Sequence, residues 1–299
     1  MLKIDLRDLE IFYWVSQLGS FRRAAERLNT TQPAISQRIA NLEVALGVKV
    51  LERGARTSAL TPRGRMLLDY AERILRLSTE MVHSVADPAT MSGVVRLGVA
   101  ETIVHTWLSR LIEQVHTQYP NISLDISVDV SLNLRNALVA GQIDLAFLLG
   151  PVSEPSMMNL DLCRYPLAFV AGPKIDLGPE PVSLERLTTL PIITYPKTTR
   201  PYIALRQMLS RSDMPNPRIY SNSSLSTIIK MTLDGIGVSV IPPTVIRREL
   251  ERGELKIVTT ELELPDLVFT ATLGMTPGLS LAEPVARLAQ EQANAYNEH

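Results

Sequence analysis

The chain has 299 residues and a formal net charge of −1, a length that suits two or three domains with a sizeable core. No apolar run approaches the ~18 residues of a membrane span, and the N-terminal sequence MLKIDLRDLE is unlike a signal peptide, so we expect a cytoplasmic protein without a membrane partner. The single cysteine, Cys163, excludes an internal disulfide framework, and we expect it to be a small buried residue.

Charge is unevenly distributed along the chain. Residues 1–65 hold 11 Lys and Arg against 6 Asp and Glu, a net of +5, whereas the remainder holds 19 against 25, a net of −6. A basic N-terminal module joined to an acidic body is the pattern of a DNA-binding domain attached to a separate sensing or catalytic domain.

The segment SFRRAAERLNTTQPAISQRIANLE, residues 20–43, predicts two short helices joined by a tight turn. Ser20 and Thr31 are good N-cap residues, and Pro33 suits the first turn of the second helix. Apolar residues recur at helical spacing, and small alanines let the two helices cross closely. The residues that point outward from the second helix are Gln32, Ser36, Gln37 and Arg38. Gln and Arg side chains can pair with adenine and guanine edges in the major groove.

The helix pair alone also fits an ordinary all-α domain, but the residues that follow favour a winged helix-turn-helix. Gly47 ends the helical stretch, and VKVLERGARTSALTPRG (48–64) predicts a strand, a turn and a second strand. A basic β-wing of this kind suits contacts with DNA phosphates. The basic residues of the wing and its flank are Lys49, Arg53, Arg56, Arg63 and Arg65.

Residues 62–87 predict one long helix with an apolar stripe. The stripe consists of Leu67, Ala71, Ile74, Ser78, Met81 and Val85, widened by Leu68, Leu75 and Val82. Its alternating steps of four and three form a seam that is short for a free coiled coil but sufficient for a dimer supported by docked domains. Packing of this helix on its own domain is the alternative. Asp87 and Pro88 end the helix, and residues 89–93 form a short hinge.

Strands and helices alternate through the rest of the chain, which predicts a mostly parallel α/β sheet with helices on both faces. The expected strands are 94–100, 122–130, 144–150, 163–173, 191–195, 218–222, 235–242, 255–260 and 267–274. The expected helices are 102–119, 132–140, 184–187, 203–212, 225–234, 245–252 and 281–295. We expect the last strand and helix to return to the first subdomain, which gives two α/β lobes joined by two crossing strands.

The chain resembles the LysR-type transcriptional regulators over its whole length. The resemblance rests on LRDLEIFYWVSQLGSFRRAAERL, TQPAISQRIANLEVALGVKVLER and LTPRGRMLL. Leu51 departs from the usual Phe, and Arg22 and Arg23 replace more usual polar residues. The resemblance implies a winged helix-turn-helix at 1–62, a linker helix and hinge at 63–90, and a periplasmic-binding-protein-like effector domain at 91–299. The expected bounds of the two lobes are 91–162 with 266–299 for lobe I, and 163–265 for lobe II.

A sequence-specific DNA-binding regulator controlled by a small-molecule effector is the function that this resemblance implies. The expected partners are an inverted-repeat DNA operator, a small organic metabolite that is more readily a carboxylate, a second copy in a homodimer or homotetramer, and RNA polymerase as a further candidate. We expect no enzyme activity, cofactor or metal, because the four histidines lack the spacing of a metal site or catalytic triad. The alternative is an architectural or nucleoid protein that binds DNA without a ligand. The expected DNA contacts are Ser20, Arg22, Thr31, Gln32, Pro33, Ser36, Gln37, Arg38, Arg53, Arg56 and Arg63.

Ligands in open α/β sheets bind beyond the carboxyl ends of the strands, where helix N-termini favour anions. The residues selected by this rule are Ala100, Glu101, Thr102, Ser131, Gly150, Lys197, Thr198, Arg200, Tyr202, Ser223 and Pro242. Lys197 and Arg200 either pair with a ligand carboxylate or are solvated loop charges. Glu101 departs from the family pattern: it repels an acidic ligand, holds an amine or hydroxyl, or only starts its helix. Tyr195 and Tyr202 either stack on a ligand ring or pack within the fold.

Overall fold

The computed structural model describes residues 4–297, apart from 54–57, 86–87, 155–156, 210–216 and 275–280. The chain divides into two compact units, with the boundary between residues 88 and 89. The finer division that treats residues 63–90 as a separate linker stays a prediction.

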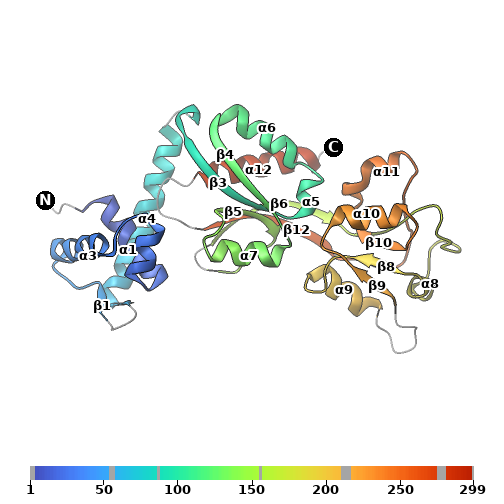
Figure 1. Cartoon of the computed structure of the whole chain (residues 1–299), viewed down its shortest axis with the longest axis horizontal. Coiled ribbons are helices and arrows are strands. Elements are labelled where there is room, and N and C mark those ends of the chain that lie inside the picture. The colour runs from blue at the N-terminus through green and yellow to red at the C-terminus, as the bar shows by residue number, and fades with distance from the viewer. Residues whose placement is uncertain are drawn as a thin grey trace. The chain divides into compact units, whose positions relative to one another are not determined.

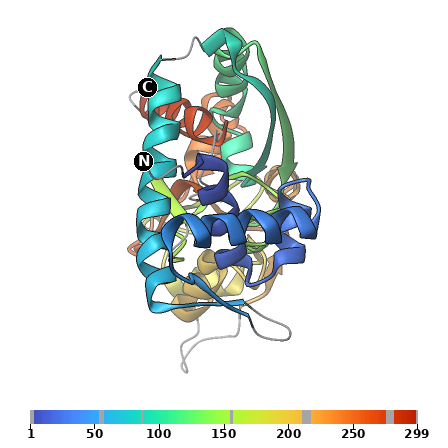
Figure 2. The same cartoon turned by 90° about the vertical axis from the view of Figure 1, so that its left-hand side faces the viewer.

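The N-terminal unit is a winged helix-turn-helix (Figures 1 and 2). Its elements are α1 (Leu6–Leu18), α2 (Phe21–Arg27), α3 (Gln32–Leu46), β1 (Leu51–Arg53), β2 (Ser58–Leu60) and α4 (Pro62–Val85). Its core forms around Phe12 of α1, Ala24 of α2 and Ile35 of α3, all fully buried. Because Ala24 has no side chain beyond Cβ, α2 can approach its neighbours closely, as the sequence predicts.

The predicted caps explain where the two central helices begin. The Ser20 hydroxyl accepts from the backbone N–H of Arg23, and the Thr31 hydroxyl accepts from that of Ala34, each at 3.4 Å. These bonds satisfy N–H groups that have no partner within their own helix. Gly47 ends α3 with a φ of +67°, a left-handed conformation that favours glycine.

Helix α4 has apolar side chains on two faces, which corrects the single predicted seam. Ala71 and Leu75 are buried in the core of the N-terminal unit, where α4 packs on α1. The burial of Ala71 and Leu75 therefore supports the alternative interpretation, in which this helix packs on its own domain. A second set is exposed and comprises Met66, Tyr70, Ile74, Leu77, Met81 and Val85. We call this set the exposed apolar face of α4.

Lobe I of the C-terminal unit is a five-stranded sheet covered by helices on both faces. The strand order is β4 (Asn121–Val128), β3 (Ser92–Val99), β5 (Leu145–Leu149), β12 (Asp266–Gly274) and β6 (Met157–Pro166). Helices α6 (Leu108–Gln118) and α12 (Ala282–Asn297) lie on one face and α7 (Ser131–Val139) on the other (Figure 1). The short η1 (Pro88–Thr90) precedes β3, and α5 (Glu101–Val104) follows it.

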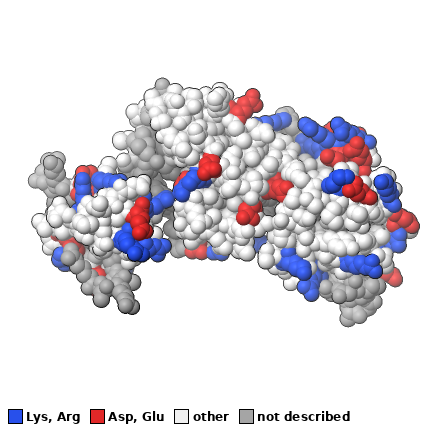
Figure 3. All heavy atoms as spheres, viewed as in Figure 1, with Lys and Arg blue, Asp and Glu red and all other residues white. Residues whose placement is uncertain are grey.

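Lobe II contains the second five-stranded sheet. Its strand order is β11 (Lys256–Ile257), β7 (Ala168–Ala171), β10 (Val238–Ile241), β8 (Ile192–Thr194) and β9 (Ile219–Ser221). Helices α9 (Arg200–Leu209) and α10 (Leu225–Leu233) lie on opposite faces (Figure 1). The remaining helices are α8 (Leu184–Thr189), η2 (Pro243–Ile246) and α11 (Arg247–Glu251). Acidic and basic side chains are interspersed on the face of this lobe in Figure 3.

Three details differ from the sequence prediction. The sheets are mixed rather than mostly parallel, because β6, β7, β11 and β12 form antiparallel pairs as the chain crosses between lobes. The helix expected at 102–119 is two helices, α5 and α6, separated at residues 105–107. Strand β6 pairs with β12 as far as Pro166, so the first crossing follows Pro166 rather than residue 162.

Candidate DNA-binding surface and effector cleft

The start of α3 presents an open polar surface. Gln32, Pro33 and Gln37 are exposed and Ser36 is half-buried, while Ile35 and Ile39 point into the core. The Gln37 amide donates to the Asn41 side-chain oxygen at 3.0 Å, one turn further along the helix. The helix therefore keeps the outward direction that its sequence predicts.

Arg38 is the exception on this surface. Its guanidinium donates to Asp8 of α1 at 3.0 Å and lies 3.6 Å from Asp5, the residue that caps α1. The hydrogen bond to Asp8 raises the pKa of Arg38 further above its usual value. Arg38 thus contacts α1 from an exposed position on α3, and its predicted role in reading a base stays a prediction. Sequence reasoning missed this pairing because Asp8 lies thirty residues earlier in the chain.

The wing is fixed by a buried carboxylate that the sequence analysis did not select. Glu43 is only 5% exposed, and it accepts from the backbone N–H groups of Val50 at 3.0 Å and Leu51 at 3.4 Å. It also accepts from the Lys49 ammonium at 2.5 Å. Burial alone would raise the pKa of Glu43, but the bonds from Lys49, Val50 and Leu51 outweigh it and lower the pKa. The clue in the sequence is an acid on an otherwise apolar helix face.

The predicted phosphate contacts are only partly described. Arg22 is exposed and lies 3.7 Å from Glu26, and Arg63 is exposed in the first turn of α4. Arg53 ends β1, but its side chain lies outside the described part of the chain, as does all of Arg56. Gly64 brings the first turn of α4 close to the wing, because a Cβ there would meet the Val50 carbonyl oxygen at 2.0 Å.

A narrow cleft lies between the two lobes of the C-terminal unit. The predicted residues that line it are Ala100, Glu101, Thr102, Ser131 and Ser223. The others are Asp129, Val130, Leu149, Tyr195, Thr199, Pro201, Leu267 and Phe269. The cleft is partly open to solvent, and its volume of about 50 Å³ is room for only a few water molecules.

Glu101 bridges the two lobes across this cleft. From the start of α5 in lobe I, its carboxylate accepts from the backbone N–H groups of Leu225 and Ser226 and from the Ser224 hydroxyl at the N-terminus of α10 in lobe II. His105, one turn after Glu101, has its Nε2 atom 3.2 Å from the Ser226 hydroxyl. The carboxylate thus satisfies the positive end of a helix in the other lobe, not only that of its own short helix.

Two further polar groups line the lobe I side of the cleft. The Ser131 hydroxyl accepts from the backbone N–H of Leu149 at 2.9 Å, and so joins the start of α7 to the end of β5. Asp129 accepts through Oδ1 from the Val130 N–H at 2.7 Å and from the Asn133 amide at 2.9 Å. Asp129, like the β12 residues Leu267 and Phe269, was not selected from the sequence. The prediction that two strands cross between the lobes could have identified Leu267 and Phe269.

Six predicted effector contacts lie outside the lining. Lys197, Thr198 and Arg200 are exposed, whereas Tyr202 and Pro242 are buried. Gly150 serves packing, because a Cβ there would meet the Thr270 hydroxyl at 2.0 Å. Of the predicted lysine and arginine partners for a ligand carboxylate, neither Lys197 nor Arg200 lines the cleft.

Two family models together match most of the chain. The bacterial regulatory helix-turn-helix protein of the lysR family matches residues 6–65, and the LysR substrate binding domain matches residues 88–292. The chain belongs to the LysR family of transcriptional regulators. This LysR-type regulator is 27% identical to the HTH-type transcriptional regulator CzcR of Bacillus cereus over 252 residues, 84% of this chain and 85% of CzcR.

Solved structures of LysR-type regulators show the same fold over nearly the whole chain. Full-length CbnR, complexed with its target DNA, gives a TM-score of 0.53 at 20% identity and covers 97% of this chain and 100% of its own. Full-length LysG from Corynebacterium glutamicum, with bound effector Arg, gives a TM-score of 0.59 at 16% identity, and the match covers 98% of this chain and 99% of LysG. At these identities the likeness supports the fold of this regulator and no particular ligand.

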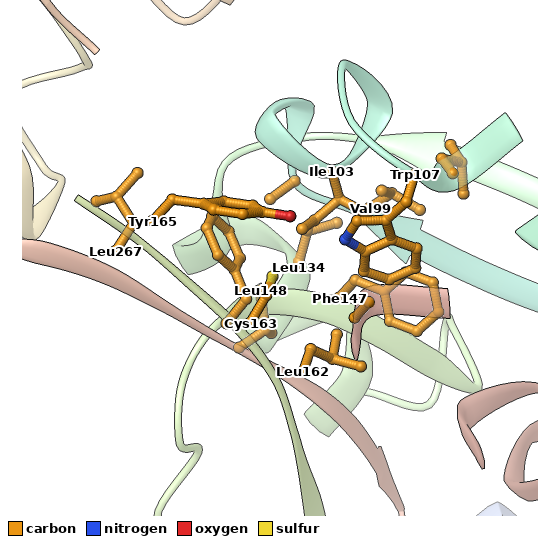
Figure 4. Close-up of a cluster of buried hydrophobic side chains, with 14 of the residues drawn as sticks. Val99, Ile103, Trp107, Leu134, Phe147, Leu148, Leu162, Cys163, Tyr165 and Leu267 are labelled. Carbon is orange, nitrogen blue, oxygen red and sulfur yellow. The ribbon is translucent and has the colours of Figure 1, made fainter. Parts of the chain in front are cut away.

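The single cysteine of this LysR-type regulator lies in the core of lobe I, as expected. Figure 4 shows Cys163 among large side chains that include Trp107, Phe147 and Tyr165. Burial raises the pKa of the Cys163 thiol to about 11, so the thiol stays protonated at neutral pH. Among the described residues, no group of three or more His, Cys, Asp or Glu is placed to hold a metal ion. Over the same residues, no helix is both long and apolar enough to cross a bilayer.

Proposed function

We propose that this LysR-type regulator binds an inverted-repeat DNA operator as a homodimer or homotetramer, under the control of a small organic metabolite bound between its lobes. The observation that carries the proposal is the exposed polar start of α3 in a chain whose C-terminal unit has a cleft between two lobes. A duplex major groove admits one such helix, and a pair of helices related by two-fold symmetry implies two half-sites. RNA polymerase is a further candidate partner.

Base reading is assigned to Gln32, Ser36 and Gln37, because they are accessible and held on a capped helix. Arg38 is assigned to positioning at the same surface, since its guanidinium already pairs with Asp8. The proposed contacts with the DNA backbone are Ser20, Arg22, Thr31, Pro33, Arg53, Arg56 and Arg63. Backbone contacts supply affinity and a steep salt dependence, whereas base contacts supply specificity.

The exposed apolar face of α4 is the proposed dimer contact. Leu77 is 65% exposed and Met81 58%, on a helix whose other apolar face, with Ala71 and Leu75, is packed in the core. Water-exposed apolar side chains in a continuous stripe favour burial against a second copy. A two-fold pair of N-terminal units formed in this way would match an inverted repeat.

The proposal is tested by measuring DNA and ligand binding on the same preparation. Footprinting on upstream DNA defines a cognate site, and fluorescence anisotropy then compares that site with random duplex at several salt concentrations. A cognate preference above tenfold supports regulation at defined sites. Equal affinity for both duplexes, with no metabolite altering the melting temperature, would instead support the architectural alternative.

A further inference from the structure

The charge of the effector cleft is the feature that the family relationship does not determine. Two carboxylates line it, Glu101 from α5 and Asp129 from the end of β4. Among the described residues, the lining contains no Lys, Arg or His. His105 lies outside the lining, with its Nε2 atom 3.9 Å from the Glu101 carboxylate. A ligand carboxylate would enter next to two like charges, the exposed Asp129 and the half-buried Glu101, with no lysine or arginine in the lining to receive it.

One place in the cleft suited to an anion, the N-terminus of α10, is already occupied. Helix α10 is nine residues long, and its N-terminus supplies the Leu225 and Ser226 N–H groups and the Ser224 hydroxyl. Helix N-termini are ready-made carboxylate sites because free N–H groups and the helix dipole act together. Glu101 fills this site from the opposite lobe. An acidic ligand at this helix end would have to displace Glu101.

Two acceptor atoms in the cleft remain available to a donor. The Tyr195 hydroxyl is buried next to Thr102 at the cleft, and no hydrogen bond of good geometry reaches it within the described residues. Burial raises the pKa of Tyr195, the Thr102 hydroxyl lowers it, and the Glu101 carboxylate raises it. The net shift of the pKa is upward, so the Tyr195 hydroxyl is neutral. Asp129 uses Oδ1 for its bonds to Val130 and Asn133, and no bond within the described chain reaches its Oδ2 atom. A carboxylate oxygen accepts from an ammonium group, and a neutral phenol, which can donate or accept, can accept a further hydrogen bond from the same group.

We infer that the effector of this cleft is an organic cation, an amine whose ammonium group is held by Asp129 and Tyr195, while Glu101 stands in for a ligand carboxylate at the N-terminus of α10. This inference rests on the proposed function of the cleft as the effector site. It replaces the expectation of an acidic effector, which depended on Lys197 and Arg200. Those two side chains lie outside the lining.

The first test compares matched ligands by thermal shift on the full-length protein. The probes are butylammonium, butan-1-ol and butyrate, with their five-carbon counterparts, all at constant ionic strength. A ligand at about ten times its Kd raises the melting temperature by about 3–6 °C, because that binding contributes about 1.4 kcal/mol. We expect the ammonium probes to produce this shift and the carboxylates to produce none. Asp129→Asn should remove the shift, whereas Asp161→Asn, an exposed acid on β6 outside the lining, should leave it.

The second test empties the helix end by substitution. Glu101→Ala removes the internal carboxylate, so acetate should stabilise this variant. Acetate should not stabilise the wild type or Glu101→Gln, whose amide oxygen still fills the position. Glu185→Ala is the control, because Glu185 is an exposed first-turn acid of α8. Acetate stabilisation of Glu101→Ala alone supports the assignment of Glu101.

The results of the two tests distinguish the preference for a cation from the assignment of the cleft as the effector site. Stabilisation of the wild type by butyrate, if Ser131→Val abolishes it, overturns the preference for a cation and leaves the cleft as the effector site. If no probe shifts the wild type and acetate has no effect on Glu101→Ala, both the cation preference and the effector cleft are overturned. Loss of sequence-specific DNA binding is measured separately and bears only on the N-terminal unit.

Discussion

Removing the Glu43 carboxylate should destabilise the N-terminal unit far more than removing its lysine partner. Glu43→Ala leaves the Val50 and Leu51 N–H groups without their buried acceptor. An unsatisfied buried donor costs about 1–3 kcal/mol, and the longer Leu51 bond counts at the low end, so we expect a loss of about 2–4 kcal/mol. Lys49→Met removes only an ion pair whose lysine is 71% exposed, which is worth about 0–1 kcal/mol. Glu43→Gln keeps an acceptor and should fall between the two.

The assay is urea denaturation followed by tryptophan fluorescence. The chain has two tryptophans, Trp14 in α1 and Trp107 in the C-terminal unit. In a Trp107→Phe background, Trp14 reports unfolding of the N-terminal unit alone. If Lys49→Met costs as much as Glu43→Ala, or if Glu43→Ala costs less than about 0.5 kcal/mol, the backbone bonds to the wing do not have the role described.

Acid should reveal the same contacts. The pKa of Glu43 is lowered in the folded state, so the unfolded chain binds a proton more readily. The stability from Glu43 is therefore fully present above the unfolded value of about 4.3 and is lost as the pH falls through the lower folded value. Glu43→Gln has no carboxylate to protonate, and its stability should fall less over this range.

Three other predictions concern separate parts of the chain. Gln37→Ala should lower the free energy of binding to the cognate site by about 1–3 kcal/mol and change binding to random duplex little, whereas Arg38→Ala should weaken binding to the two duplexes equally. If anisotropy shows a cognate-specific loss for Arg38→Ala and an equal loss for Gln37→Ala, Arg38 is the base reader. Leu77→Asp should split the dimer and halve the mass measured by light scattering, whereas the control Val44→Asp, at an 81% exposed position of α3, should leave the mass unchanged. A Leu77→Asp variant that remains dimeric would place the contact elsewhere. Native Cys163 should resist thiol reagents at pH 7, because a pKa of about 11 leaves roughly one thiolate in ten thousand; rapid labelling of the folded protein would contradict its burial.

Local signals in the sequence predicted the helix-turn-helix well. Ser20, Thr31 and Gly47 act through residues one turn away, so capping chemistry alone locates the ends of α2 and α3. The alternation of strands and helices likewise predicted two lobes. It did not reveal that the crossing strands run antiparallel to their neighbours, because the direction of a strand depends on which sheet it enters.

Long-range pairing limited the prediction of both sites. Arg38 lies on the outer face of α3 as expected, but its partner Asp8 belongs to another helix. The strand-end rule found Glu101 and Ser131, yet it also selected Lys197 in a loop and Arg200 at the start of α9, and both lie outside the lining. A rule about strand ends identifies the correct edge of a sheet, but side-chain direction within a loop depends on packing that no local pattern encodes.

The two apolar faces of α4 constrain its length as well as its composition. One residue adds about 100° of rotation and 1.5 Å of rise to a helix. A single-residue insertion between Leu75, which is buried, and Leu77, which is exposed, would turn the later part of the helix away from its original direction. Such an insertion keeps every side chain, yet Met81 and Val85 would no longer share a face with Tyr70 and Ile74. Substitutions along α4 should therefore be common among natural variants, whereas insertions and deletions within it should be rare.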